Sequence, residues 1–282
     1  MTKERLTRSD RCSTIDAMIM KLTGGALALV ALGVACGRQG AVDDRHAAQE
    51  ALRIERRVEE ALGGTEAWEA ARFVDFVWAA NQTTPDEERP PLERRHVWDR
   101  VTGRYKLVMA TPEGELTALF DDIDIMEGNA WIDGVPVEDT LRLDSLLRRS
   151  RAAFVHDTYW LLLPFMLRDP GVTVQYLGAT ADESGKQWET LQLTFDSTMT
   201  ARTGRSLVYV DPESFLIGWW EHFGEPDMTQ TNTRTRWLEW EQRGPLLVSL
   251  DRPMLDGTQA VFFPRVEIST VVREQAFAPP SQ

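Results

Sequence analysis

Short stretches of alternating apolar and polar residues, joined by tight turns, are the feature that most restricts how this chain can fold. From Val74 to Ala80 every second residue is apolar, which is the period of a strand with one buried face. Thr102-Gly103 separates two more such segments, and Asp211-Pro212-Glu213-Ser214 separates another pair. Turns this short join antiparallel strands, because parallel strands need long crossover connections. The pattern therefore predicts a β-rich fold with antiparallel pairing.

Two helical segments interrupt the strands. Between about His46 and Leu62 apolar residues recur at spacings of three and four, and Gly63-Gly64 is expected to end that helix. A longer helical segment is expected over about 138–167, with Pro164 breaking it. The remaining strands are expected at 96–100, 104–109, 116–120, 131–132, 172–177, 188–195, 206–211, 215–223, 234–241, 246–251 and 260–271. No internal linker is evident, so residues 45–278 are predicted to form a single β-rich α+β domain.

The charge of the chain restricts its partners. Its 282 residues carry a formal net charge of −13, whereas binding to the phosphates of nucleic acid needs a basic surface. The same excess of acidic side chains disfavours electrostatic attraction to anionic lipid headgroups. With 43% hydrophobic and 27% charged residues, the chain can bury a sizeable core, and disorder over most of its length is not expected.

An apolar run near the N-terminus predicts export. Lys21 precedes the run from Leu22 to Ala35, which is too short for a membrane-spanning helix but suits the apolar region of a signal peptide. Because residues 1–17 do not resemble a signal, Met18 and Met20 are alternative starts of translation. We therefore expect residues 1–35 to be a signal peptide.

The apolar run ends in Gly33-Val34-Ala35-Cys36. This segment resembles the bacterial lipobox, although Leu32 stands one position before the place of the usual leucine. The resemblance implies a lipid on Cys36, a lipidated tether over 36–44, and an exported lipoprotein that is anchored to a membrane and faces the periplasm or the cell surface. The alternative is an ordinary signal peptide cut near Ala35. Cys12, the other cysteine, lies in the expected signal peptide, so no disulfide is expected.

The sequence contains no recognisable motif for binding a metal ion or a cofactor. None of the four histidines, at positions 46, 96, 156 and 222, is paired at i, i+4, and no cysteine accompanies them, so no metal is expected. Asp121-Asp122 and Asp124 lack the spaced oxygen ligands and closing glutamate of a calcium loop. The sequence also contains no phosphate-binding loop and no dinucleotide-binding glycine motif, so no cofactor is expected.

Catalytic residues are not indicated either. The sequence contains no G-x-S-x-G turn for a nucleophile. His156-Asp157 and Glu221-His222 are adjacent pairs, and neighbours in a strand point to opposite faces, so neither pair is expected to act on one substrate. We predict no catalytic residue and no enzymatic activity. Asp157 is expected to be buried and hydrogen-bonded or to act as a helix cap; the alternative places it at the mouth of a cavity.

Tryptophan is frequent, with ten in the chain, and most lie in the expected strands or the central helix. Trp219-Trp220 places one indole on each face of a strand. Apolar side chains on both faces are expected where helices cover one face of a sheet or where the sheet curves around a cavity. Most of the tryptophans are expected to belong to the core. The candidates for contact with an apolar ligand are Trp78, Tyr105, Trp160 and Trp219.

The most specific segment of the chain is HDTYWLLLPFMLRDPG, from His156 to Gly171. It resembles the signature N-D-T-Y-W-L-x-x-P-x-x-L-R-D-P-G of a family of exported bacterial lipoproteins, with His156 in place of the usual asparagine. The matching positions include Asp157, Tyr159, Trp160, Pro164, Arg168, Asp169, Pro170 and Gly171. Weaker matches extend the resemblance over about residues 60–278 and include Gly63-Gly64, Trp68, Trp98, 102–105, 208–211, Trp219-Trp220 and Phe277.

That family is similar, more distantly, to the outer-membrane lipoprotein carriers of the LolA and LolB type. The resemblance implies a curved antiparallel sheet, an incomplete barrel, with helices covering its open side over an apolar cavity that holds acyl chains. We therefore expect a lipid-anchored envelope protein that binds or carries a hydrophobic ligand, an acyl chain or a lipid, beneath the 138–167 helical segment. The alternative is a non-catalytic structural or protein-interaction module of the envelope, with a filled core. No protein partner is indicated.

Overall fold

The computed structural model describes residues 35–84, 87–196, 204–225, 228–231, 233–255 and 260–280, with the backbone alone for 35–43, 82–89 and 260. Residues 41–282 form one compact unit, and the residues up to 40 form another. Apart from Ala35, the expected signal peptide lies outside the described residues, as does the side chain of Cys36.

Two antiparallel sheets make up most of the unit 41–282. The larger sheet has nine strands in the order β12-β13-β14-β1-β2-β3-β4-β5-β6, so β12 and β6 are its two edges and it is not closed into a barrel. Its strands are β1 (Phe73–Thr84), β2 (Glu87–Asp99), β3 (Tyr105–Thr111), β4 (Gly114–Asp122), β5 (Glu127–Ile132), β6 (Val135–Pro136), β12 (Leu238–Arg243), β13 (Leu246–Pro253) and β14 (Ala260–Ser269).

The smaller sheet has five strands in the order β11-β10-β9-β8-β7. They are β7 (Val172–Ala181), β8 (Gln187–Phe195), β9 (Arg205–Val210), β10 (Ile217–Phe223) and β11 (Thr233–Arg236). Consecutive strands within this sheet are neighbours and pair antiparallel.

The helices are α1 (Ala35–Ala61), α2 (Gly64–Ala70) and α3 (Thr140–Leu162), with short 3₁₀ turns η1 (Leu163–Phe165) and η2 (Glu274–Phe277). Asp139 caps α3, since its side chain accepts a hydrogen bond of 2.7 Å from the backbone N–H of Arg142. Pro164 follows the end of α3 and lies in η1, in agreement with its predicted role. Among the described residues, no helix combines the length and apolar character that crossing a bilayer requires.

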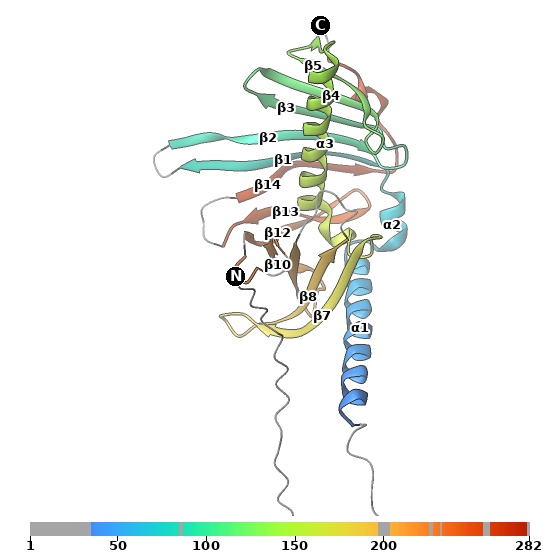
Figure 1. The fold of residues 1–282 in the computed structure, drawn as a ribbon, viewed down its shortest axis with the longest axis vertical. Helices are drawn as coiled ribbons and strands as arrows, with labels where there is room; N and C mark the ends of the chain where they lie inside the picture. The colour runs from blue at the N-terminus through green and yellow to red at the C-terminus, as the bar shows by residue number, and fades with distance from the viewer. Residues whose placement is uncertain are drawn as a thin grey trace, which may run out of the picture. The chain divides into compact units, whose positions relative to one another are not determined.

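The predicted architecture is confirmed: a β-rich fold with a large, curved antiparallel sheet, open at its edges and covered by helices. Figure 1 shows α3 crossing the strands of the larger sheet between β5 and β13. Its N-terminal half packs on β3, β4 and β5 through residues such as Leu146 and Leu147. Its C-terminal half enters the main core, which both sheets and α1 share. As the alternation predicts, Val74, Phe76, Trp78 and Ala80 all point into that core.

The predicted turns at 102–103 and 211–214 join β2 to β3 and β9 to β10. The turn at the end of the signature segment is also present. Gly171 has φ +86°, which glycine adopts without the strain that a side chain would bring. The N–H of Val172 donates to the carbonyl of Asp169 at 3.1 Å, and the chain then enters β7.

Two predicted boundaries were wrong. The first helix, expected from about His46, begins at Ala35, so the segment 36–44 is helical. The role of that segment as a lipidated tether remains a prediction. Gly63-Gly64 ends α1 as predicted, and α2, which was not predicted, follows directly. The strand expected over 234–241 is two strands in different sheets, because the chain leaves the smaller sheet at Trp237 and continues in the larger one. The N–H of Trp237 donates to the carbonyl of Gly218 at 2.9 Å, a tertiary contact that sequence periodicity does not reveal.

Candidate functional site

A buried carboxylate on α3 lies at the centre of a hydrogen-bonded network under the helix. Asp157 is fully buried, and four N–H groups approach its two oxygens. Arg94 of β2 donates from Nε to Oδ2 and from Nη2 to Oδ1, both at 2.6 Å. Nε2 of His96 lies 2.9 Å from Oδ2, and Nδ1 of His156 lies 2.6 Å from Oδ1. We call these four residues, together with Tyr105, the Asp157 cluster.

The partners of His96 define its role in this cluster. Because an ionised carboxylate only accepts hydrogen bonds, the ring hydrogen of His96 is assigned to Nε2. Nδ1 then accepts from the hydroxyl of Tyr105, 2.7 Å away on β3. The ring of Phe76 stacks on the imidazole, with centroids 4.5 Å apart and an interplanar angle of 6°. Both ring nitrogens of His96 are therefore satisfied, and the ring links β2, β3 and α3.

Burial and hydrogen bonding have opposite effects on the titration of the cluster. Burial alone would raise the pKa of Asp157, but hydrogen bonds from His156, His96 and Arg94 outweigh it and hold that pKa well below its usual range. Burial lowers the pKa of His96, although Asp157 opposes this effect. Burial also raises the pKa of Tyr105 well above its ordinary value. At neutral pH the cluster is thus an ionised Asp157–Arg94 pair flanked by a neutral His96 and a neutral Tyr105.

Three of the four predicted ligand contacts lie around this cluster. Tyr105 belongs to it. The Arg94 guanidinium lies 3.8 Å from the centre of the Trp78 ring, a cation–π contact. Nε1 of Trp160 donates to Nε2 of His156 at 3.2 Å. The structure therefore brings Trp78, Tyr105 and Trp160 to one interface, between α3 and the larger sheet.

Trp219 does not lie at this interface. It points to the other face of β10, where its ring stacks on Tyr209 with centroids 3.6 Å apart. Its neighbour Trp220 faces the core and lies 5.3 Å from Trp160, ring centre to ring centre. The pairing of β9 with β10 is irregular between Ile217 and Trp219, so the alternation along β10 could not show which indole points inward.

His156 and Asp157 were expected to point to opposite faces, as neighbours in a strand do, and this geometry was wrong. They lie in α3, within the predicted helical segment, and their side chains form a direct hydrogen bond. That they do not act on one substrate remains a prediction. For Asp157 itself, the prediction of a buried, hydrogen-bonded residue is confirmed, whereas the cap of α3 is Asp139.

The signature residue Tyr159 anchors α3 to the smaller sheet. Its hydroxyl lies 3.1 Å from Oγ of Ser206 on β9, and that oxygen lies 3.1 Å from Nδ1 of His222 on β10. A serine beside a histidine is the pairing used by nucleophilic hydrolases. Ser206, however, is fully buried beneath Tyr159, so a substrate has no access to it. The three residues hold α3 in place.

A buried arginine also lies beneath α3. Arg252 of β13 is fully buried, and burial lowers its pKa well below the ordinary value. Its Nη1 donates to Oγ of Ser249 at 2.5 Å, and its Nη2 donates to the carbonyl of Trp160 at 3.2 Å. Its guanidinium lies 3.7 Å from the centre of the Trp237 ring. Arg252 thus connects the sheet to the C-terminal end of α3 through neutral partners.

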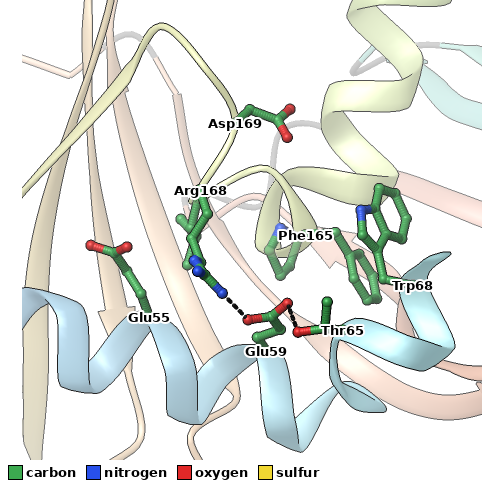
Figure 2. Close-up of a pocket in the computed structure, with 9 residues that line it drawn as sticks. Glu55, Glu59, Thr65, Trp68, Phe165, Arg168 and Asp169 are labelled. Atoms are coloured by element: carbon green, nitrogen blue, oxygen red, sulfur yellow. Dashed lines mark hydrogen bonds and ion pairs between the residues drawn. The ribbon is translucent and has the colours of Figure 1, made fainter.

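The second half of the signature segment lines a pocket between α1, α2 and η1 (Figure 2). The pocket has a volume of about 260 Å³. Its apolar wall includes Trp68 and Phe165, whose rings stack with centroids 4.8 Å apart. Arg168 donates to Oε2 of Glu59 at 2.6 Å across the pocket. The signature Pro164 and Asp169 also line it, together with Glu55, Thr65 and Leu167.

Several of these site residues were missed by the sequence analysis although a periodic signal pointed to them. In β13, Leu246, Val248, Leu250 and Arg252 occupy every second position and are all buried, so the strand period places the arginine on the core face. In α1, Glu55 lies beside Ile54 on the buried apolar stripe of the helix. Arg252 and Glu55 are thus charged residues at positions where the strand or helix period predicts a buried side chain, and this signal could have identified them.

Within the part of the chain that the structure describes, no three His, Cys, Asp or Glu side chains come close enough together to hold a metal ion.

No protein-family model matches this chain, and no curated protein matches its sequence. Among solved structures, a LolA superfamily protein from Nitrosomonas europaea matches with a TM-score of 0.49 and 11% sequence identity, over 81% of this chain and 97% of that one. A DUF1329 family protein from Desulfovibrio piger matches with a TM-score of 0.47 and 7% identity, over 82% and 97% of the two chains. The likeness concerns the arrangement of the sheet and helices. The expected membership in the lipoprotein family of the 156–171 signature remains a prediction.

We expect the free energy of unfolding to decrease as the pH is lowered from about 7 to about 5. Burial lowers the pKa of His96 and of His222 in the folded protein. Below about pH 6.5 the unfolded chain therefore binds protons that the folded chain does not, at up to about 1.4 kcal/mol per pH unit for each histidine. Urea denaturation at several pH values measures the effect, and His222→Gln should make it shallower. A stability that does not change over this range would contradict the assignment.

Proposed function

We propose that the protein binds a hydrophobic ligand of the acyl-chain class between the larger sheet and α3, and that α3 moves to admit it. The observation that carries this proposal is the Asp157 cluster, a charged network within a largely apolar interface. The three aromatic residues Trp78, Tyr105 and Trp160, which face the same interface, would contact the ligand.

The cluster is not needed to hold a permanently closed interface. Removing Asp157 and Arg94 from water costs free energy that their attraction only partly offsets, and apolar side chains of similar size can pack as well. Directional hydrogen bonds do, however, define one position of the helix on the sheet. If α3 leaves the sheet and returns, the hydrogen bonds of the Asp157 cluster would bring it back to the same position.

The energetics of exchange are also favourable. In the structure the side chains of α3 fill the interface, with Phe154 lying 4.7 Å from Tyr105 and 5.0 Å from Trp98, ring centre to ring centre. An acyl chain that covered the sheet in place of these side chains would recover about 25 cal/mol for each Å² of apolar surface. The displaced helix would keep its attachment through Tyr159 and the residues beyond it.

A second candidate function is a non-catalytic structural or protein-interaction module of the envelope. It is favoured by the close packing under α3, where Leu147, Leu161 and Leu162 are all buried. The pocket of about 260 Å³ lies elsewhere, beside α1. The two functions differ in one physical property, which is whether α3 separates from the sheet.

Ligand uptake by the unit from residue 41 to residue 282 tests the proposal. We expect this unit, produced without the N-terminal segment, to bind a fluorescent fatty acid at micromolar concentration and to show acyl adducts in native mass spectrometry. Hydrogen exchange should show that the amides of α3 lose protection on binding, because the helix leaves the sheet, while those of β1 to β4 keep theirs.

Two tryptophans provide a matched pair of variants. Trp160→Ala should weaken uptake by about tenfold or more, since about 1.4 kcal/mol of lost contact is sufficient for that change. Trp219→Ala should leave uptake unchanged, because Trp219 lies on the opposite face of β10. A unit that carries no adduct and binds no acyl probe would leave the envelope module as the function.

We also propose that a lipid on Cys36 anchors the exported protein to a membrane. The support is the sequence Gly33-Val34-Ala35-Cys36 after an apolar run. Cys36→Ser removes the sulfur that a lipid thioether requires, so it should abolish incorporation of labelled palmitate and leave a soluble or uncleaved protein. Equal labelling of wild type and variant would refute the anchor.

A further inference from the structure

A carboxylate in the pocket beside α1 lacks a hydrogen-bonding partner. Glu55 is only 7% exposed and lines the pocket. In Figure 2, dashed lines join Glu59 to Arg168 and to Thr65, and none reaches Glu55. Its carboxylate oxygens reach the space of the pocket, and within the described residues no hydrogen bond or ion pair involves them. A charged carboxylate on a largely buried side chain is costly when it has no hydrogen-bonding partner.

The other charged groups of the pocket have partners. Both oxygens of Glu59 are occupied, one by Nη1 of Arg168 at 2.6 Å and the other by Oγ1 of Thr65 at 2.7 Å. Asp169 lies close enough to Arg100 to raise the pKa of that arginine, against the larger effect of burial. Arg168 attracts Glu55 only at longer range, as does the neighbouring Arg56. One negative charge, that of Glu55, is thus left without a direct counter-charge.

The apolar wall of the pocket is an aromatic stack that an arginine covers on its other side. Phe165 covers one face of Trp68, and the guanidinium of Arg100 lies 3.4 Å from the centre of the same indole. The polar groups of the pocket come from α1, from Thr65, and from Arg168 and Asp169 of the turn that follows η1. The volume of about 260 Å³ is close to the lower end of small-molecule sites, which begin near about 300 Å³.

From this arrangement we propose that the pocket binds a small organic ammonium ion, whose charge pairs with Glu55 and whose apolar part packs against Trp68 and Phe165. An ammonium group supplies up to three N–H donors. The Glu55 carboxylate receives no hydrogen bond from the described residues, so it can accept one from such a group. A calcium ion would need six or more oxygen ligands, and a fatty-acid carboxylate would be repelled. The site is separate from the interface under α3 and does not depend on the function proposed for it.

Calorimetric titration of the full-length protein tests the proposal. We expect n-butylammonium to bind with a Kd at or below about 1 mM. n-Butanol has the same apolar part without the charge, so it should bind about tenfold more weakly or worse. Two short-chain phospholipids then compete with butylammonium for the pocket. If dihexanoyl phosphatidylethanolamine competes and dihexanoyl phosphatidylglycerol does not, the source of the ammonium group is a lipid headgroup. No competition by either lipid would identify a free amine.

Variants of α1 separate binding from folding. Glu55→Gln keeps the shape of the side chain and should weaken butylammonium binding by about tenfold or more. Glu60→Gln, on the exposed side of the same helix where Glu60 pairs with Arg57, should not change it. Without ligand, Glu55→Gln should melt at the same temperature as wild type or higher, since a buried unpaired charge is removed.

The proposal is overturned if butylammonium and butanol bind equally, or if both phospholipids compete equally. It is also overturned if Glu55→Gln retains full affinity. A Glu55→Gln protein that melts at a lower temperature would show that the carboxylate stabilises the fold and does not await a ligand.

Discussion

Replacing Asp157 with alanine should lower the free energy of unfolding by about 3–5 kcal/mol, the range for breaking a buried ion pair from one side. The substitution removes the acceptor for two N–H groups of Arg94, for Nε2 of His96 and for Nδ1 of His156. His96 is fully buried, so its ring N–H would lose its partner without gaining water. Urea denaturation at neutral pH measures the change.

Two further variants identify the cause of this loss. Asp157→Asn keeps the shape of the side chain but brings a donor group toward Arg94, so most of the loss should remain. Asp144→Ala removes a carboxylate from the exposed side of the same helix, where Asp144 pairs with Arg148, and should cost at most about 0.5 kcal/mol. Similar stabilities for Asp157→Ala and Asp144→Ala would show that the cluster does not hold α3 on the sheet.

Replacing Trp160 with alanine should lower the free energy of unfolding by about 3–5 kcal/mol through the cavity it leaves. The indole is 8% exposed and packs edge-on against Trp220, with ring centres 5.3 Å apart. It also donates a hydrogen bond to His156, so its loss removes a partner from the Asp157 cluster.

Trp160→Phe is the matched control, because it retains an aromatic ring and removes the N–H. Its cost should be nearer to about 1–2 kcal/mol. A cost below about 1 kcal/mol for Trp160→Ala would mean that the neighbours of the indole collapse into its space. That outcome would indicate an interface under α3 that rearranges easily, and it would strengthen the case for a movable helix.

The strand pattern was predictable because it depends on local features. Alternation along β1 and the short turns between β2 and β3 and between β9 and β10 are encoded by neighbouring residues, so they can be recognised without knowledge of tertiary contacts. The end of α3 near Pro164 and the turn at Gly171 follow from the backbone limits of proline and glycine. The beginning of α1 and the existence of α2 lacked signals of this kind.

The candidate site was predictable only in part. Of the four residues expected to contact a ligand, Trp78, Tyr105 and Trp160 lie between α3 and the larger sheet, whereas Trp219 does not. Contact with a ligand remains a prediction for all of them. Arg94 and His96, which complete the cluster, lie about sixty residues before Asp157 in the chain. No local pattern connects residues so far apart.

The sequence by itself determined where most of the strands and the two longer helices lie, that pairing is antiparallel, and that the 156–171 segment is the most distinctive part of the chain. These properties follow from periodicity and from the backbone preferences of single residues. The tertiary structure alone decided that Trp220 and not Trp219 faces the core, that the 234–241 segment divides between two sheets, and that Asp157 receives four N–H groups. It also decided that Glu55 is left without a partner in its pocket. The physical reason is that hydrogen bonding and burial depend on which residues meet in space, and those contacts arise only when the sheets and α3 pack together.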